Sequence, residues 1–160
     1  MRLLMEHPEQ LQLLLDKPEL VPYACEEILR YNAAFLAMRR MAMDDVEVGG
    51  QMIRKGDKVV LFWHGINRDE RVFDDPMSFN IERYVDMPDL YKEHRAFGFG
   101  THFCLGSHLA RLEMRVMFDE ILPRLRNPTF AGPVQYVRDY FVNGIKSMPI
   151  KFDPETTAAS

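Results

Sequence analysis

The chain has 160 residues, of which 47% are hydrophobic and 28% are charged, and its formal net charge is −4. This length and composition predict one domain with a sizeable core, and the acidic balance with scattered basic residues argues against a nucleic-acid partner. No apolar run approaches the ~18 residues of a membrane span, and Pro8 interrupts the N-terminal segment too early for a signal peptide.

Two helices are predicted near the N-terminus. Residues 8–16 begin with a proline, continue with acid and amide side chains and then with leucines, which is typical of a helix start. Lys17 and Pro18 end this helix. A second helix is predicted over about residues 19–31, in which Pro22 is tolerable only near the first turn.

The second helix carries a Glu-x-x-Arg pair. Glu27 and Arg30 are three residues apart and therefore share one helix face. Without further context, such a pair is usually solvated and stabilises a helix by roughly 0.2–0.5 kcal/mol.

A small antiparallel β unit is predicted between residues 39 and 63. Apolar and polar residues alternate there, and Gly49-Gly50 marks a turn. Arg39 and Arg40 lie at the start of the unit, and the ordinary interpretation of each is a surface arginine at a strand start. Residues 64–96 lack sustained periodicity and are rich in turn-forming residues, which predicts a long irregular connection.

The segment 97–106 places Cys104 in a glycine-rich loop at what reads as the start of a helix. A thiol binds metal as the thiolate, and backbone N–H groups at a helix N-terminus stabilise that negative charge. Gly98, Gly100 and Gly106 lack Cβ atoms, which allows a flat, bulky partner to approach the backbone closely. The loop therefore indicates an anionic ligand for a planar cofactor.

Three other interpretations of this loop are less favourable. Most cysteines in a long soluble chain are inert small hydrophobes. A zinc site built from His102, Cys104 and His108 lacks a fourth donor and a Cys-x-x-Cys pair. A nucleotide loop needs a third glycine and a preceding apolar strand, and both are missing. Cys25 and Cys104 show no disulfide pattern, which favours a reducing, cytoplasmic location.

The strongest helical pattern follows Cys104 and ends near Pro123. An apolar stripe at helical spacing is expected to face the core, and its members are Leu105, Leu109, Leu112 and Val116. The tail at about 129–152 reads as short strands with a hairpin turn at Asn143-Gly144. Residues 153–160 are expected to be a disordered end.

The pattern Phe97-x-x-Gly100-x-His102-x-Cys104-x-Gly106 resembles the haem-binding signature of the cytochrome P-450 family, in particular its soluble bacterial members. The resemblance implies that Cys104 ligates the iron of haem b, that Phe97 packs near the sulfur, and that His102 hydrogen-bonds a haem propionate. Thiolate ligation pushes electron density onto the iron and favours O–O cleavage.

The resemblance assigns further residues outside the loop. Arg40 stands where the family supplies a propionate-binding arginine, with Arg39 as its competitor. Glu27 and Arg30 become a buried ion network with Arg83 as the third member, which is costly to break because one deleted partner leaves a desolvated charge. The hairpin at 141–145 would bring residues to the substrate side of the haem.

The fold implied by the resemblance is mainly α with small antiparallel β elements, the C-terminal portion of the cytochrome P-450 fold. Residues 1–152 form a partial domain in which the oxygen-activating helix would lie before Met1, so no catalytic residue is identified within the chain. The expected function is O2-dependent hydroxylation of a small apolar substrate, such as a sterol or lipid, with electrons from a ferredoxin-type or flavoprotein donor. The alternative is a non-catalytic haem-binding or partner-binding fragment.

Overall fold

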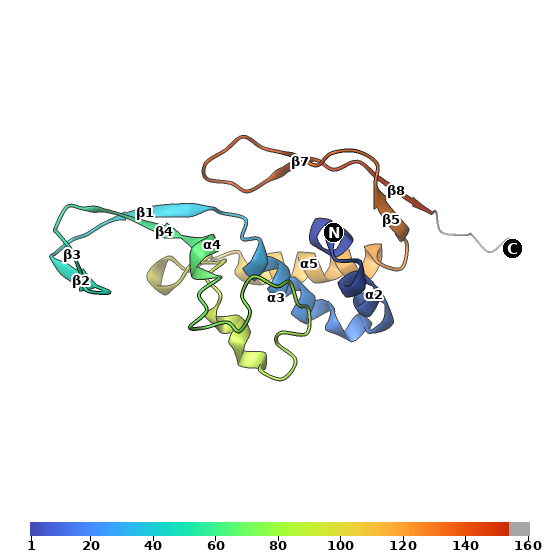
Figure 1. Ribbon diagram of the computed structural model, residues 1–160, viewed down its shortest axis with the longest axis horizontal. Coiled ribbons are helices and arrows are strands. Elements are labelled where there is room, and N and C mark those ends of the chain that lie inside the picture. The colour runs from blue at the N-terminus through green and yellow to red at the C-terminus, as the bar shows by residue number, and fades with distance from the viewer. Residues whose placement is uncertain (154–160) are drawn as a thin grey trace, which may run out of the picture.

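The computed structural model describes residues 1–153, and Figure 1 shows the arrangement of its elements. The helices are α1 (Arg2–Glu6), α2 (Pro8–Asp16), α3 (Val21–Tyr31), α4 (Trp63–Ile66) and α5 (Ser107–Ile121), with short 3₁₀ helices at Pro18–Leu20, Pro88–Glu93 and Gly100–His102. The strands are β1 (Ala37–Met41), β2 (Val46–Val48), β3 (Gln51–Ile53), β4 (Lys58–Phe62), β5 (Arg126–Phe130), β6 (Gln135–Tyr136), β7 (Ile145–Ser147) and β8 (Ile150–Asp153). The strands pair into two-stranded antiparallel sheets, which confirms the expected fold class.

The N-terminal helices follow the local rules of the sequence. Helix α2 begins at Pro8 and ends at Asp16, as predicted. Helix α3 begins at Val21 rather than near residue 19, because Pro18–Leu20 form a 3₁₀ turn first, and Pro22 lies in its first turn. Helix α1 was not predicted.

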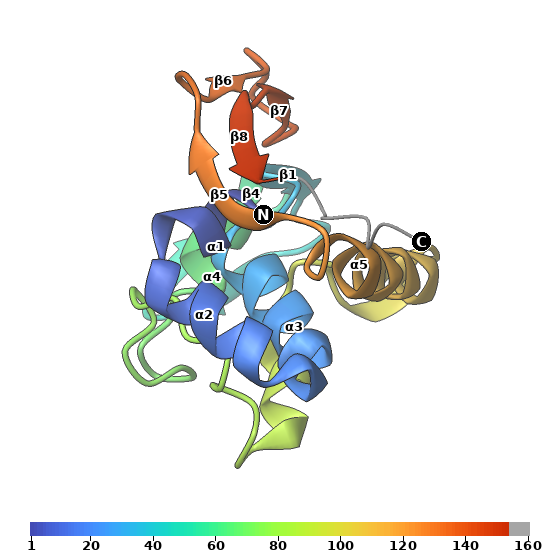
Figure 2. The ribbon, with the colours of Figure 1, turned by 90° about the vertical axis from the view of Figure 1, so that its right-hand side faces the viewer.

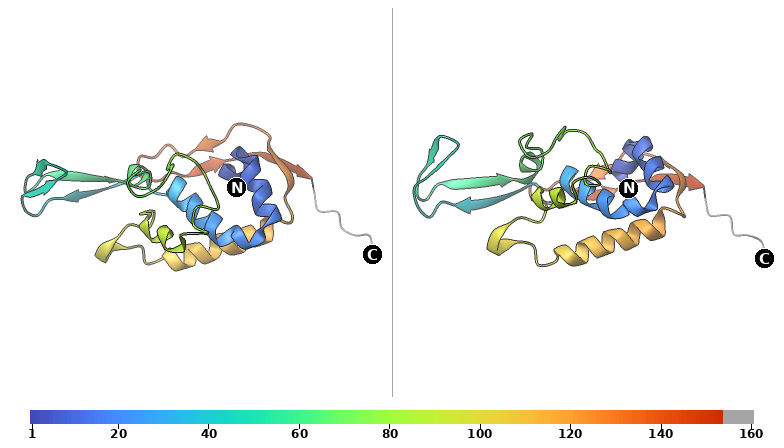
Figure 3. Two further views of the ribbon diagram at one scale, coloured as in Figure 1. Left: turned by 60° about the horizontal axis from the view of Figure 1, so that its bottom comes forward. Right: turned by 90° about the horizontal axis from the view of Figure 1, so that it is seen from below.

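The core lies between the N-terminal helices and α5. It contains apolar side chains of α1, α2 and α3, together with Phe79, Ile81, Phe118 and Leu122. Helix α3 lies between α2 and α5 (Figures 2 and 3). Because α3 is enclosed on both sides, its charged residues are buried as well as its apolar ones.

A β hairpin projects from one end of the molecule (Figures 1 and 3). Strand β1 pairs with β4, and β2 pairs with β3 farther out. Gly49 and Gly50 connect β2 to β3 with φ values of +57° and +78°, which only glycine adopts without strain. The turn predicted there is confirmed.

The apolar stripe of α5 does not face the core, which corrects the sequence prediction. Leu105 precedes the helix and is 99% exposed, and Leu109, Leu112 and Val116 are each more than half exposed. Helix α5 instead buries Ser107 and Phe118. Periodicity shows that one helix face is apolar, but packing selects the covered face, and α3 packs against a neighbouring one.

The C-terminal tail departs from the prediction at two places. Strands β6 and β7 pair, but Asn143-Gly144 is not their turn, because the connection spans residues 137–144 and Asn143 bonds to Ala34 and Asn32 instead. Asp153, expected in the disordered end, is the last residue of β8. The rest of that end, 154–160, lies outside the described residues.

Candidate functional site

Cys104 lies on the loop between the 3₁₀ helix Gly100–His102 and α5. It is three residues before the helix, not at its start, and its side chain is exposed. Its N–H donates to the Phe97 carbonyl at 2.9 Å, and its own carbonyl accepts from the Ser107 N–H at 3.2 Å. These two bonds fix the backbone on both sides of the thiol.

Two glycines of the loop have left-handed backbone. Gly98 has φ +74° and Gly100 has φ +66°, values that cost an L-residue about 1–2 kcal/mol. A Cβ at Gly100 would have no atom within 4 Å, so open space adjoins the backbone there. A Cβ at Gly106 would lie 3.9 Å from the Cys104 sulfur, so the backbone is close to the thiol on that side.

A cavity of about 710 Å³ opens beside this loop. The loop supplies one wall, and α3, the segment after it and the β1/β4 hairpin supply the others. The lining residues are Leu29, Ala34, Phe35, Met38, Arg40, Leu61, Trp63, Ala96, Phe97, Gly98, Phe99, Gly100, Thr101, His102, Cys104 and Ala110. A mostly apolar wall with a few polar groups is typical of a cofactor or ligand site.

Of the predicted loop residues, Phe97, Gly100, His102 and Cys104 line the cavity, and Gly106 lies just behind the sulfur. Arg40 lines it as well, but its neighbour Arg39 does not. The donor set is therefore one thiol and two side chains that can carry positive charge, in an apolar pocket with glycine backbone on one wall. These residues fit a flat apolar group that carries a metal and two carboxylates, as haem does.

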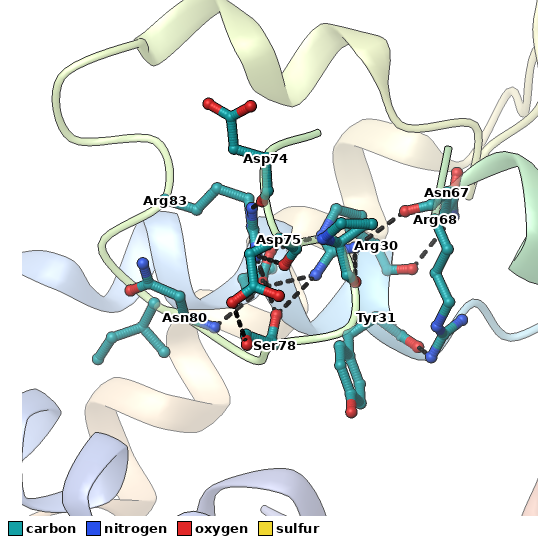
Figure 4. A network of polar contacts seen from close by, with 12 residues as sticks. Arg30, Tyr31, Asn67, Arg68, Asp74, Asp75, Ser78, Asn80 and Arg83 are labelled. Carbon is teal, nitrogen blue, oxygen red and sulfur yellow. Dashed lines mark hydrogen bonds and ion pairs between the residues drawn. The ribbon is translucent and has the colours of Figure 1, made fainter. Parts of the chain in front are cut away.

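Glu27 forms ion pairs with both Arg30 and Arg83, and Figure 4 shows these two arginines within a network of polar contacts. The Arg30 side chain is fully buried and donates to both carboxylate oxygens of Glu27 at 2.8 Å. Arg83 Nε donates to the same carboxylate at 3.1 and 3.2 Å. Burial alone lowers the pKa of Arg30, but its hydrogen bonds to Glu27 hold the pKa above the ordinary value.

This network is connected to the segment that precedes the Cys104 loop. Arg30 Nη1 donates to the Asn67 carbonyl at 2.9 Å, and the Asn67 amide donates to the Arg30 carbonyl at 3.3 Å. The Asn67 side-chain oxygen accepts the Arg95 N–H at 2.6 Å. Helix α3 thus holds the backbone just before Phe97.

A second buried cluster was missed by the sequence analysis. Glu26 Oε2 lies 2.9 Å from His94 Nε2, and both side chains are almost completely buried. Arg111 of α5 donates to both oxygens of Glu26 at 2.7 and 3.0 Å. The partners lie 68 and 85 residues from Glu26, so no spacing rule connects them.

Among residues 1–153, no three His, Cys, Asp or Glu side chains gather in an arrangement that could hold a metal ion. No helix in this described part is long and apolar enough to cross a membrane. Cys25 and Cys104 are both free, and Cys25 is buried.

The chain is similar to one known family of proteins. A sequence model of the family "Cytochrome P450" matches residues 12–130. Cytochrome P450-terp of a Pseudomonas species is 42% identical over 149 residues, covering 93% of this chain and 33% of the relative. Linalool 8-monooxygenase of Pseudomonas putida is 38% identical, covering 95% and 36%. Steroid C26-monooxygenase of Mycolicibacterium smegmatis is 40% identical, covering 94% and 37%.

Solved structures of cytochromes P450 are also similar to this chain. CYP109E1 from Bacillus megaterium, in complex with testosterone, matches with a TM-score of 0.86 and 32% identity over 95% of this chain and 41% of that one. Cytochrome P450-153 from Novosphingobium aromaticivorans matches with a TM-score of 0.84 and 35% identity over 94% and 37%. The chain therefore spans about a third of the length of the curated relatives it matches.

Proposed function

Because the chain belongs to the cytochrome P450 family, we propose that it supplies the haem-binding, thiolate-bearing part of an O2-dependent monooxygenase. The observation that carries the proposal is the exposed thiol of Cys104 at the wall of a largely apolar cavity that Arg40 and His102 also line. When bound there, haem b with a thiolate ligand supplies O2 activation and O–O cleavage. Cys104 is the ligand, and Arg40 and His102 hold the propionates.

The chain's own residues prepare this ligand. The bonds of Cys104 to Phe97 and Ser107 hold the thiol at the cavity wall. Gly98 and Gly100 let a planar group lie close to the backbone. Phe97 and Phe99 make this wall apolar, so a bound group that covers it displaces water, and the lower local dielectric strengthens the attraction between carboxylates and cations.

We propose that the substrate is a small apolar molecule and, more specifically, a sterol or a lipid. Phe35 lines the cavity and packs against Phe141, with ring centroids 4.8 Å apart and the ring planes tilted by 50°. Phe35 also forms a β bridge with Val142, so the segment near residues 141–145 adds apolar surface beside the cavity. The names of the relatives, which include a steroid and a linalool monooxygenase, support an apolar substrate. A ferredoxin-type or flavoprotein donor would supply the electrons.

The first test is haem binding by the 160-residue chain. Trp63, the chain's single tryptophan, lines the cavity and lies edge-on to Phe99. Added haem should quench its fluorescence, and the reduced carbon-monoxide complex should show the red-shifted band of thiolate ligation. Cys104→Ala should abolish the band, whereas the matched variant Cys25→Ala should keep it. A band that survives in Cys104→Ala would overturn the assignment.

One observation favours the alternative of a haem-binding chain without turnover. O–O cleavage needs protons delivered to the bound dioxygen, and no carboxylate of residues 1–153 lines the cavity. With reductant, an electron-transfer protein and apolar compounds, the 160-residue chain should consume NAD(P)H with little hydroxylated product. If most reducing equivalents appear as product, the non-catalytic alternative fails.

A further inference from the structure

We propose that Glu26, His94 and Arg111 form a positioning unit that holds Phe97 and, through it, the backbone of Cys104. This inference rests on the proposed role of Cys104 as the haem ligand. It assigns a task to residues that lie outside both the haem signature and the Glu27, Arg30 and Arg83 network.

Glu26 is the centre of the unit. Its side chain is buried on α3, next in sequence to Glu27, but it faces different partners. Arg111 binds it in the two-pronged geometry that gives the strongest and most directional ion pairs. Burial by itself raises the pKa of Glu26, and the hydrogen bonds from His94 and Arg111 outweigh burial and lower it below its ordinary value. The carboxylate is therefore charged at neutral pH.

Arg111 reaches the Cys104 loop with its other side. Its guanidinium carbon lies 4.6 Å from the centroid of the Phe97 ring, within the range of a cation–π contact. Because Glu26 fixes the guanidinium plane, the Phe97 ring has a fixed surface to pack against. The Phe97 carbonyl accepts the Cys104 N–H. A change in the orientation of Phe97 would therefore directly move the hydrogen bond that holds the backbone of Cys104.

His94 holds the same segment from the other end. Its Nε2 lies against Glu26, and its Nδ1 accepts the Ala96 N–H at 3.4 Å. A ring that accepts at Nδ1 carries its proton on Nε2 and donates it to Glu26. The residues on either side of Ala96 are also held, Arg95 by Asn67 and Phe97 by Arg111.

The two consecutive glutamates of α3 thus hold one short segment in two ways. Glu27 acts through Arg30 and Asn67 on Arg95, and Glu26 acts through His94 and Arg111 on Ala96 and Phe97. A unit that only stabilised the fold would have no need to contact the residues on which the ligand cysteine depends. The geometry therefore assigns Glu26, His94 and Arg111 to ligand positioning.

The test variant is Arg111→Lys, which keeps the positive charge but loses the planar two-pronged contact and the flat face over Phe97. Hydrogen exchange of the 97–104 segment is measured first in the haem-free chain. Arg111→Lys should speed exchange of the Cys104 amide by about tenfold or more, as expected for the loss of a charge-assisted contact. Arg115→Lys makes the same change four residues later on the same helix and should leave the rate unchanged.

A second pair of variants separates positioning from general stability. Leu14→Ala removes a buried core side chain of α2 and should lower global stability without speeding exchange in 97–104 beyond the change in the rest of the chain. His94→Gln keeps an amide donor for Glu26 and should restore part of the protection that His94→Ala loses. If Arg111→Lys changes the loop no more than Arg115→Lys or Leu14→Ala does, the proposal is wrong.

The haem-loaded chain gives an independent readout. In Arg111→Lys and Glu26→Gln, a larger share of the reduced carbon-monoxide complex should lack the thiolate band than in the unmodified chain or in Arg115→Lys. An unmodified chain that binds no haem would refute the proposed function but not this unit, because the exchange measurement needs no haem. An unchanged band together with unchanged exchange would overturn the unit alone.

Discussion

Replacement of Arg30 should destabilise the chain more than any single surface substitution. Arg30 is fully buried and donates five hydrogen bonds, two to Glu27 and three to the carbonyls of Asn67, Pro76 and Ser78. Arg30→Ala removes the donor of the Asn67 and Pro76 carbonyls and leaves Arg83 as the remaining side-chain donor to Ser78 and the remaining cation beside Glu27. Breaking a buried ion pair from one side costs about 3–5 kcal/mol, against a total stability of about 5–15 kcal/mol for a domain.

The partners of Arg30 predict a pattern across three variants. Arg83→Ala should cost about 1–3 kcal/mol, because the pair between Arg30 and Glu27 survives. Glu27→Ala and Arg30→Ala should each be severe, but the double variant should cost less than their sum, with a coupling of about 2–3 kcal/mol. Each single change leaves the other charge buried, and the double change leaves neither.

The assay is urea unfolding followed by Trp63 fluorescence and far-UV circular dichroism. Trp63 is 2% exposed and should report loss of tertiary structure. The matched control is Glu120 and Arg124, an exposed pair four residues apart, whose coupling should be only about 0.3–0.5 kcal/mol. A coupling between Glu27 and Arg30 as small as that of the control would refute the reasoning.

Three further results are expected. Burial raises the pKa of the Cys25 thiol to about 12, so iodoacetamide at pH 8 should label only Cys104 in the native haem-free chain and both thiols in denaturant. Mass spectrometry counts the labels, and two labels on the native protein would contradict this. The pKa of Glu26 is held below its ordinary value of 4.5, so its contribution to stability should be complete above pH 4.5 and lost as pH falls through the lowered pKa of the folded chain. In urea unfolding, the free energy of unfolding of Glu26→Gln should therefore fall less steeply with acid than that of the unmodified chain, and equal slopes would count against this reasoning. Gly100→Ala strains a left-handed backbone, so it should cost about 1–2 kcal/mol of stability and weaken haem retention on gel filtration. Gly132→Ala, where a Cβ would make ordinary contacts, should change neither property, and normal haem retention in Gly100→Ala would exclude a strict need for glycine.

Sequence reasoning was most successful where near neighbours decide the conformation. Pro8 and the leucines that follow it start α2, and Gly49-Gly50 closes the β2/β3 hairpin. The motif around Cys104 indicated the family, and the family model and relatives confirm that membership. The resemblance also favoured Arg40 over Arg39; Arg40 lines the cavity, and its role as a propionate ligand stays a prediction.

Local rules failed where a distant segment offered a better contact. Asn143-Gly144 has a strong turn preference, but the Asn143 side chain bonds to Asn32 and its N–H to Ala34. These contacts outweigh the small free energy that separates one turn from another. The chain therefore bends at residues 140–141 of the 137–144 connection instead.

Sequence patterns alone pointed to Cys104 as a candidate ligand, to its glycine-rich loop, to the helices with clear start signals and to the Glu27/Arg30 pair of α3. The packing of the folded chain turns Arg111 and Phe118 of α5 inward and leaves Leu109 and Leu112 exposed, which no sequence pattern indicated. Packing also places His94 and Arg111, and not water, against the carboxylate of Glu26. Periodicity records which helix face is apolar, but the partner of a buried charge is set by distance in space, and sequence separation does not encode that distance.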